Sequence, residues 1–229
     1  GVDRARFSEL MRQQKERARA DAKAKKGGAT SLEAYKKIRE GHETPFVGYR
    51  ELEHETKVIG IVSGDQVVTS AGDGQVVELV LAETPFYAES GGQDSDAGRI
   101  TGDGWSAEVL DVQRPVPGLV VHRVQLFGDL GEGAVAHAAV DPVTRHAASQ
   151  AHTATHIVHA ALRELVGQAA TQAGSYNKPG YLRFDYSATH AMSEALRLEV
   201  EQRANQAIRD SFEVTASQMK LEEAKALGA

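Results

Sequence analysis

The stretch His152-Thr153-Ala154-Thr155-His156-Ile157-Val158-His159 is the part of the chain around which the rest is organised. An apolar helical pattern continues beyond it and stops at Gly167, so the sequence predicts a helix here. Residues four apart lie on one face of a helix, and His152 and His156 can therefore present their imidazoles to a common point. A helix usually offers two nitrogen ligands to zinc in this way.

The same spacing has other interpretations. A pair of histidines four residues apart also occurs on ordinary helix surfaces and in hydrogen-bonded cores, and His159 on the same face could be a third ligand or a polar plug. No glutamate lies between His152 and His156, so the HExxH pattern of metalloproteases, whose glutamate is the general base, is absent. We do not expect a metal-dependent protease.

Composition limits the class of protein. A chain of 229 residues with 41% hydrophobic content is typical of a globular protein of one or two domains. No apolar run reaches the length of a membrane span and the N-terminus is charged, so we expect neither a membrane helix nor a signal peptide. The absence of cysteine excludes disulfides and is compatible with a cytoplasmic protein. Any zinc on the histidine pair must take its other ligands from non-cysteine residues, from water, or from a part of the protein outside this sequence.

Charge is distributed unevenly. Residues 1–40 carry 12 Lys and Arg against 6 Asp and Glu, whereas the whole chain has a net charge of −6. Residues 3–26 are predicted to form a long amphipathic helix that ends at Gly27-Gly28, and residues 31–39 a second short helix or a linker. A basic segment on an acidic body can mark a nucleic-acid contact, and a merely solvated helix is the alternative.

The character of the sequence changes after Pro45. Short β-branched runs separated by Gly, Asp and Pro, the first of them at residues 46–49, predict a small antiparallel barrel, with residues 134–140 closing it. A helical period begins near Val143 and is followed by further elements, so the fold class is α+β. The expected segments are a basic helical segment at 1–44, the barrel at 45–141 and an α+β core at 142–229. Within the last segment the pattern predicts strands at 181–186 and 212–219 and helices at 194–210, capped by Ser193, and at 221–227.

A glycine-rich segment, TPFYAESGGQ at residues 84–93, interrupts the barrel strands. Gly91 and Gly92 permit a tight turn there, and a phosphate cradle is not favoured because no Walker Lys-Ser/Thr pair follows.

Four motifs in order, TPFYAESGGQ (84–93), HTATHIVHAAL (152–162), QAGS (172–175) and LRFD (182–185), resemble the editing region of alanyl-tRNA synthetases. The resemblance implies a barrel followed by an α+β editing core, with the basic helix joining the barrel to the tRNA-recognition module. It also implies hydrolysis of alanine tRNA mischarged with serine or glycine, while aminoacylation with ATP and magnesium occurs in a module outside this sequence. An alanine pocket cannot strongly reject glycine or serine, so a second, hydrolytic site is the expected remedy.

The resemblance also implies roles for single residues. His152 and His156 match two zinc ligands, and the family's other two, a Cys and a His, would follow Ala229, so we expect a fragment with half a metal site. Gln172 matches the editing glutamine, and Gln93 belongs to a segment that approaches the site. Thr153 and Thr155 could supply hydroxyls or simply form helix surface and packing. The alternative function is a non-catalytic module that binds tRNA or another nucleic acid, with a structural histidine pair.

Overall fold

The computed structural model describes residues 6, 11, 12, 32–188, 190–215 and 217–227. The predicted basic helix at 3–26 lies outside the described residues except for Arg6, Met11 and Arg12. Among the described helices, none is both long enough and apolar enough to cross a membrane.

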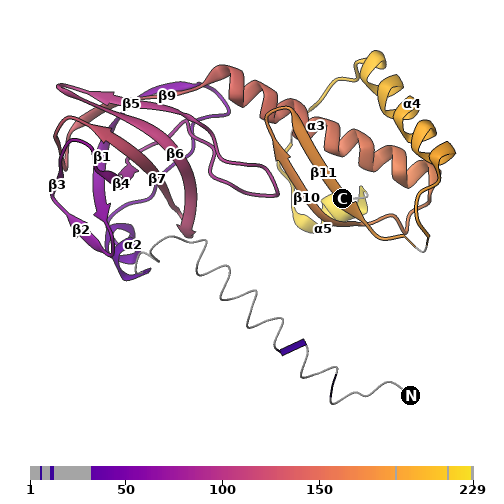
Figure 1. Cartoon of the computed structure of the whole chain (residues 1–229), viewed down its shortest axis with the longest axis horizontal. Helices are drawn as coiled ribbons and strands as arrows, with labels where there is room; N and C mark the ends of the chain where they lie inside the picture. Colours follow the sequence, from indigo (N-terminus) through magenta and orange to yellow (C-terminus); the bar gives the residue numbers. More distant parts are fainter. Residues whose placement is uncertain (1–5, 7–10, 13–31, 189, 216, 228–229) are drawn as a thin grey trace.

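A closed antiparallel barrel forms the first half of the described chain (Figure 1). Its strands follow the spatial order β1, β4, β7, β6, β5, β9, and β9 pairs with β1 from Glu53↔Ala139 to Lys57↔Val135. The predicted closure by residues 134–140 is therefore confirmed. The strand bounds are β1 Glu53–Ser63, β4 Val76–Leu81, β5 Gly98–Gly102, β6 Trp105–Val116, β7 Leu119–Phe127 and β9 Val135–Val140. Two short additions are β2 (Gln66–Val68), paired with β1, and β3 (Ser70–Ala71), paired with β8 (Leu130–Gly131).

Side chains that alternate along the strands fill the interior of the barrel. Inward residues such as Leu79, Leu81 and Val124 are fully buried in one cluster, as alternation of side chains across a strand requires. The outward Val80 is also buried, because helix α2 (Leu32–Arg39) covers that patch. Of the two alternatives for residues 31–39, the structure shows the helix, over Leu32–Arg39, and this helix covers one outer face of the barrel.

A second layered unit follows the barrel. The long helix α3 (Pro142–Leu165) packs against the hairpin of β10 (Gln172–Lys178) and β11 (Tyr181–Tyr186) and against α4 (Glu194–Asp210). The shared core is made by Ala161, Leu162, Ala170 and Val200, with Phe184 and Tyr186 of β11 at its edge. The strand at 181–186 and the helix capped by Ser193 are confirmed, and so is the α+β class. The division into 1–44, 45–141 and 142–229 stays a prediction.

Two predicted strands are wrong. The described residues of 212–219 form no strand, and Phe212 and Val214 are 73% and 86% exposed. Alternating apolar residues are not enough, because a strand needs a hydrogen-bonded neighbour. The run at 46–49 gives only one isolated bridge, Phe46↔Thr84, before a turn.

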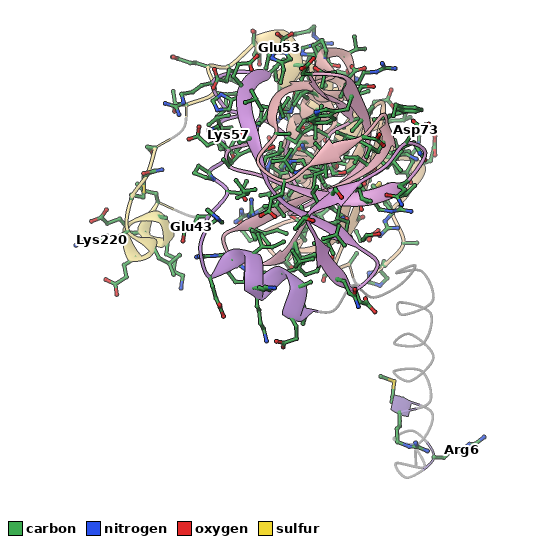
Figure 2. The ribbon with its side chains drawn as sticks, turned by 90° about the vertical axis from the view of Figure 1, so that its left-hand side faces the viewer. Arg6, Glu43, Glu53, Lys57, Asp73 and Lys220 are labelled. Atoms are coloured by element: carbon green, nitrogen blue, oxygen red, sulfur yellow. The ribbon has the colours of Figure 1, made fainter. Side chains whose placement is uncertain are left out.

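The last described helix, α5 (Leu221–Ala226), confirms the helix predicted at 221–227. It buries none of its side chains. Figure 2 shows it, marked by Lys220, standing apart from the packed body.

A buried histidine ties the barrel to the segment that begins at Thr84. His122 is fully buried in β7, where its Nδ1 donates to the carbonyl of Leu79 at 3.0 Å and its Nε2 accepts from the Thr84 hydroxyl at 2.7 Å. The same hydroxyl oxygen accepts from the amide of Phe86 at 3.1 Å. Burial lowers the pKa of His122 from 6.5 to about 4, although the bond to Leu79 opposes the shift. The ring is therefore neutral in the folded protein.

The lowered pKa predicts a pH-dependent stability. Between pH 6.5 and 4 the unfolded chain binds a proton at His122 that the folded chain does not, so acidification favours unfolding. Across that window the contribution of His122 falls by roughly 3 kcal/mol. Denaturant unfolding of the chain and of His122→Gln at several pH values measures this. The difference in unfolding free energy between the two proteins should narrow as the pH falls, and parallel stability curves would contradict the assignment.

Candidate functional site

The first turn of helix α3, directly after the last barrel strand, is stabilised by a capping residue. Its N-cap Asp141 accepts hydrogen bonds from the amides of Thr144 and Val143, both at 2.9 Å, and these bonds lower the pKa of the Asp141 carboxyl. Pro142 occupies the first turn, where its missing N–H costs nothing. The helix direction is therefore set directly at the end of β9.

Arg145 joins the first turns of α3 to the barrel. Its guanidinium forms an ion pair with Asp96, whose side chain is 2% exposed, and donates to the carbonyls of Gly48 and Pro85, both at 2.8 Å. Asp96 also accepts from the amide of Tyr87 at 2.6 Å. Each guanidinium nitrogen of Arg145 and each carboxylate oxygen of Asp96 thus has a hydrogen-bond partner. A buried ion pair is tolerated under this condition. It fastens α3 to the connection between β4 and β5.

The histidine pair lies two turns further along α3. The rings of His152 and His156 stack with centroids 5.0 Å apart and planes 19° from parallel. His152 is half-buried and His156 is exposed. Burial, and secondarily the neighbouring His156, lower the pKa of His152. The neutral ring, which is the form that binds a metal, is therefore favoured at His152.

The glycine-rich segment predicted to approach the site reaches this helix. Residues 84–97 leave the barrel between β4 and β5 and extend to the β10–β11 hairpin (Figure 1). Gln93 is buried, with 7% of its surface exposed, and its side-chain Oε1 lies 2.7 Å from Nδ1 of His152. The structure thus brings together two predicted site residues from separate motifs.

Both glycines before Gln93 adopt left-handed backbone conformations, with φ of +60° at Gly91 and +82° at Gly92. They differ in surroundings: a Cβ at Gly91 would meet nothing within 4 Å, whereas one at Gly92 would lie 2.6 Å from the carbonyl oxygen of Ser175 in β10. Gly92 therefore allows the loop to press against the hairpin.

The two threonines of the histidine motif face different ways. Thr153 is exposed, whereas Thr155 is 4% exposed and lies on the packed face of α3. The Thr155 hydroxyl contacts the carbonyl of Ala151 at 3.0 Å and the side-chain oxygen of Asn177 at 2.5 Å. Asn177 of β10 is 1% exposed, and sequence reasoning missed it, because a single polar residue in a strand carries no periodic signal.

Gln172 and His159 have partners other than the histidine pair and Gln93. Gln172 begins β10, is exposed, and donates from Nε2 to the Ser175 hydroxyl at 2.9 Å. His159 donates from Nε2 to the carbonyl of Ala170 at 3.2 Å and packs its ring 4.9 Å from that of Phe184. Of the two interpretations left open for His159, this environment corresponds to the polar plug.

Within the described ranges, no three or more His, Cys, Asp or Glu side chains are grouped so that they could hold a metal. An open depression of about 560 Å³ lies at the other end of the barrel, lined by residues such as Glu55, Trp105 and His137. It includes none of the predicted site residues. We therefore place the candidate site at the histidine pair and the loop beside it.

Comparison with known proteins identifies the class. Residues 1–144 match the family model for class II (A) tRNA synthetases, and the chain belongs to this family. Alanine–tRNA ligases resemble it along its whole length, with 61% identity in Cutibacterium acnes, 57% in Paenarthrobacter aurescens and 54% in Arthrobacter sp.. These alignments cover 100% of this chain and 26% of each relative, so the chain spans about a quarter of their length. The resemblance to alanyl-tRNA synthetases is confirmed.

The two glycines provide a matched pair of variants. Alanine in a left-handed conformation costs about 1–2 kcal/mol at either position. At Gly92 the added Cβ also meets the Ser175 main chain, which adds roughly 1–3 kcal/mol of overpacking. Unfolding by denaturant should therefore show Gly92→Ala to be clearly less stable than Gly91→Ala. Equal stabilities would mean that the loop does not rest on β10.

Proposed function

We propose that this chain is the editing portion of an alanyl-tRNA synthetase. In this proposal it hydrolyses the ester that joins serine or glycine to the 3′ end of the alanine tRNA, while ATP-dependent aminoacylation belongs to another module of the ligase. The observation that carries the proposal is the pair of adjacent imidazoles on α3, one of them held by the glycine-rich loop. The similarity to alanine–tRNA ligases, which extends along the whole of this chain, supports it.

The histidine pair fits zinc as two of its ligands. Neutral imidazoles are common zinc ligands, and the lowered pKa of His152 keeps its ring in that form. The remaining ligands would come from residues outside this sequence, as the resemblance implies. Bound there, zinc supplies the positive charge that orients the aminoacyl group or polarises water.

The chain's own polar groups would position the substrate. The amide of Gln172 and the hydroxyl of Thr153 are exposed near the start of β10 and on α3, where they can hydrogen-bond an aminoacyl group. Gln93 would act through His152, which it contacts. The role of Thr155 is then to hold the helix against Asn177 rather than to present its hydroxyl.

The proposal predicts a selective loss of editing. In the complete ligase that contains this segment, replacing both His152 and His156 by alanine should slow hydrolysis of seryl-tRNA(Ala) about a hundredfold or more, because the metal's charge stabilisation is lost. Alanine charging should remain near the wild-type rate, since it occurs elsewhere in the ligase. Rates of deacylation and of charging on the same preparations provide the measurement.

His146→Ala is the matched control, because His146 is an exposed histidine of the same helix outside the pair. It should leave both rates unchanged. Wild-type deacylation by the double variant would remove the pair from the reaction. Retained tRNA affinity in that case would favour the non-catalytic binding module.

A further inference from the structure

The contact between Gln93 and His152 determines which ring nitrogen carries the proton. The atom 2.7 Å from His152 Nδ1 is the carbonyl oxygen of the Gln93 amide, which can only accept a hydrogen bond. Nδ1 must therefore be the donor. In a neutral imidazole with its proton on Nδ1, the free lone pair is on Nε2.

One residue of the hairpin holds Gln93 from both sides. Asn177 donates its backbone N–H to the carbonyl of Gly92 at 2.6 Å and accepts from the amide of Asp94 at 2.9 Å. The preceding residue of the strand adds a third contact, since the Tyr176 hydroxyl donates to Asp94 Oδ2 at 2.9 Å. The backbone on either side of Gln93 is thus fixed by β10.

The side chain of the same asparagine reaches α3. It is 1% exposed and contacts Thr155, three residues after His152 on the helix, while its Nδ2 has no hydrogen-bond partner among the described residues. Burying an unpaired amide donor costs roughly 1–3 kcal/mol, so packing alone would favour an apolar residue. Its side-chain contact with Thr155 joins the strand that holds the loop to helix α3.

We propose that Gln93 is a positioning residue that selects the Nδ1–H tautomer of His152, and that the backbone of Asn177 keeps the Gln93 segment in place. The inference rests on the proposed function in one respect: the Nε2 lone pair left free in this way would serve zinc binding. Outer partners of metal-binding histidines commonly fix the ring in this manner, and their loss typically lowers metal affinity about 10–100-fold.

The tautomer can be read directly from the chain without metal or tRNA. At pH 8 imidazoles of ordinary pKa are neutral, and ¹⁵N NMR distinguishes protonated from unprotonated ring nitrogens. The His152 signals are assigned by their loss in His152→Asn. In the wild-type chain, Nδ1 should be the protonated nitrogen and Nε2 the unprotonated one.

Variants separate selection of the tautomer from packing. Gln93→Met keeps the side-chain length and removes the acceptor, so both nitrogen shifts of His152 should move toward the values of a tautomer mixture. Gln93→Glu restores an acceptor and should restore the Nδ1–H form. Gln150→Met, at an exposed glutamine on α3, should change nothing. Backbone amide spectra show that each variant is folded.

Two results would overturn the proposal: a wild-type His152 protonated on Nε2, or a folded Gln93→Met variant that keeps the Nδ1–H form. A second readout is zinc affinity in the complete ligase, which Gln93→Met should lower about 10–100-fold and Gln93→Glu should retain. Unchanged affinity in the methionine variant would contradict the link to the metal. If the editing proposal alone is wrong, the nitrogen shifts stay as predicted and only the seryl-tRNA experiment fails.

Discussion

The buried ion pair between Arg145 and Asp96 is the constraint on which the site depends. It joins α3 to the β4–β5 connection at one point, close in sequence to the site residues on both segments. His152 lies seven residues after Arg145, about 10 Å along the helix, and Gln93 lies three residues before Asp96. The two side chains then meet at 2.7 Å. A buried ion pair contributes little net stability, but losing one partner leaves an uncompensated charge. We infer that this pair mainly fixes the alignment of helix and loop.

The loop is held at three places by three kinds of contact. Thr84 is bonded to the buried His122 of the barrel, Asp96 to Arg145 of α3, and the segment around Gln93 to Asn177 of the hairpin. A loop held in this way keeps the Gln93 side chain against His152, so little further conformational entropy is lost when a ligand binds. This arrangement gives a physical reason for a barrel beside helix α3: the barrel supports the loop whose Gln93 contacts His152 on that helix.

Much of the fold and part of the candidate site could be predicted from the sequence, and the predictions that were wrong or missing have physical causes. Period-2 runs predicted the barrel and its closure, and the spacing of His152 and His156 placed them together on one helix. The contact of Gln93 with His152 joins residues 59 apart and follows from no local pattern, so only the family resemblance pointed to it. Alternation predicted a strand at 212–219, but no neighbouring strand pairs with its described residues. The inward direction of Thr155 follows from the packed face that it shares with Ala148 and Ala151, a periodicity present in the sequence.

Anomalous diffraction at the zinc absorption edge, from crystals of the complete ligase that contains this segment, would locate the metal relative to the histidine pair. We expect a zinc peak bonded to Nε2 of His152 and to a nitrogen of His156, with the Gln93 side-chain oxygen still hydrogen-bonded to Nδ1 of His152. Zinc bonded to Nδ1 with Gln93 displaced would contradict the proposed orientation of the ring. A fully zinc-loaded ligase in which neither histidine is a ligand would contradict the assignment of the site itself.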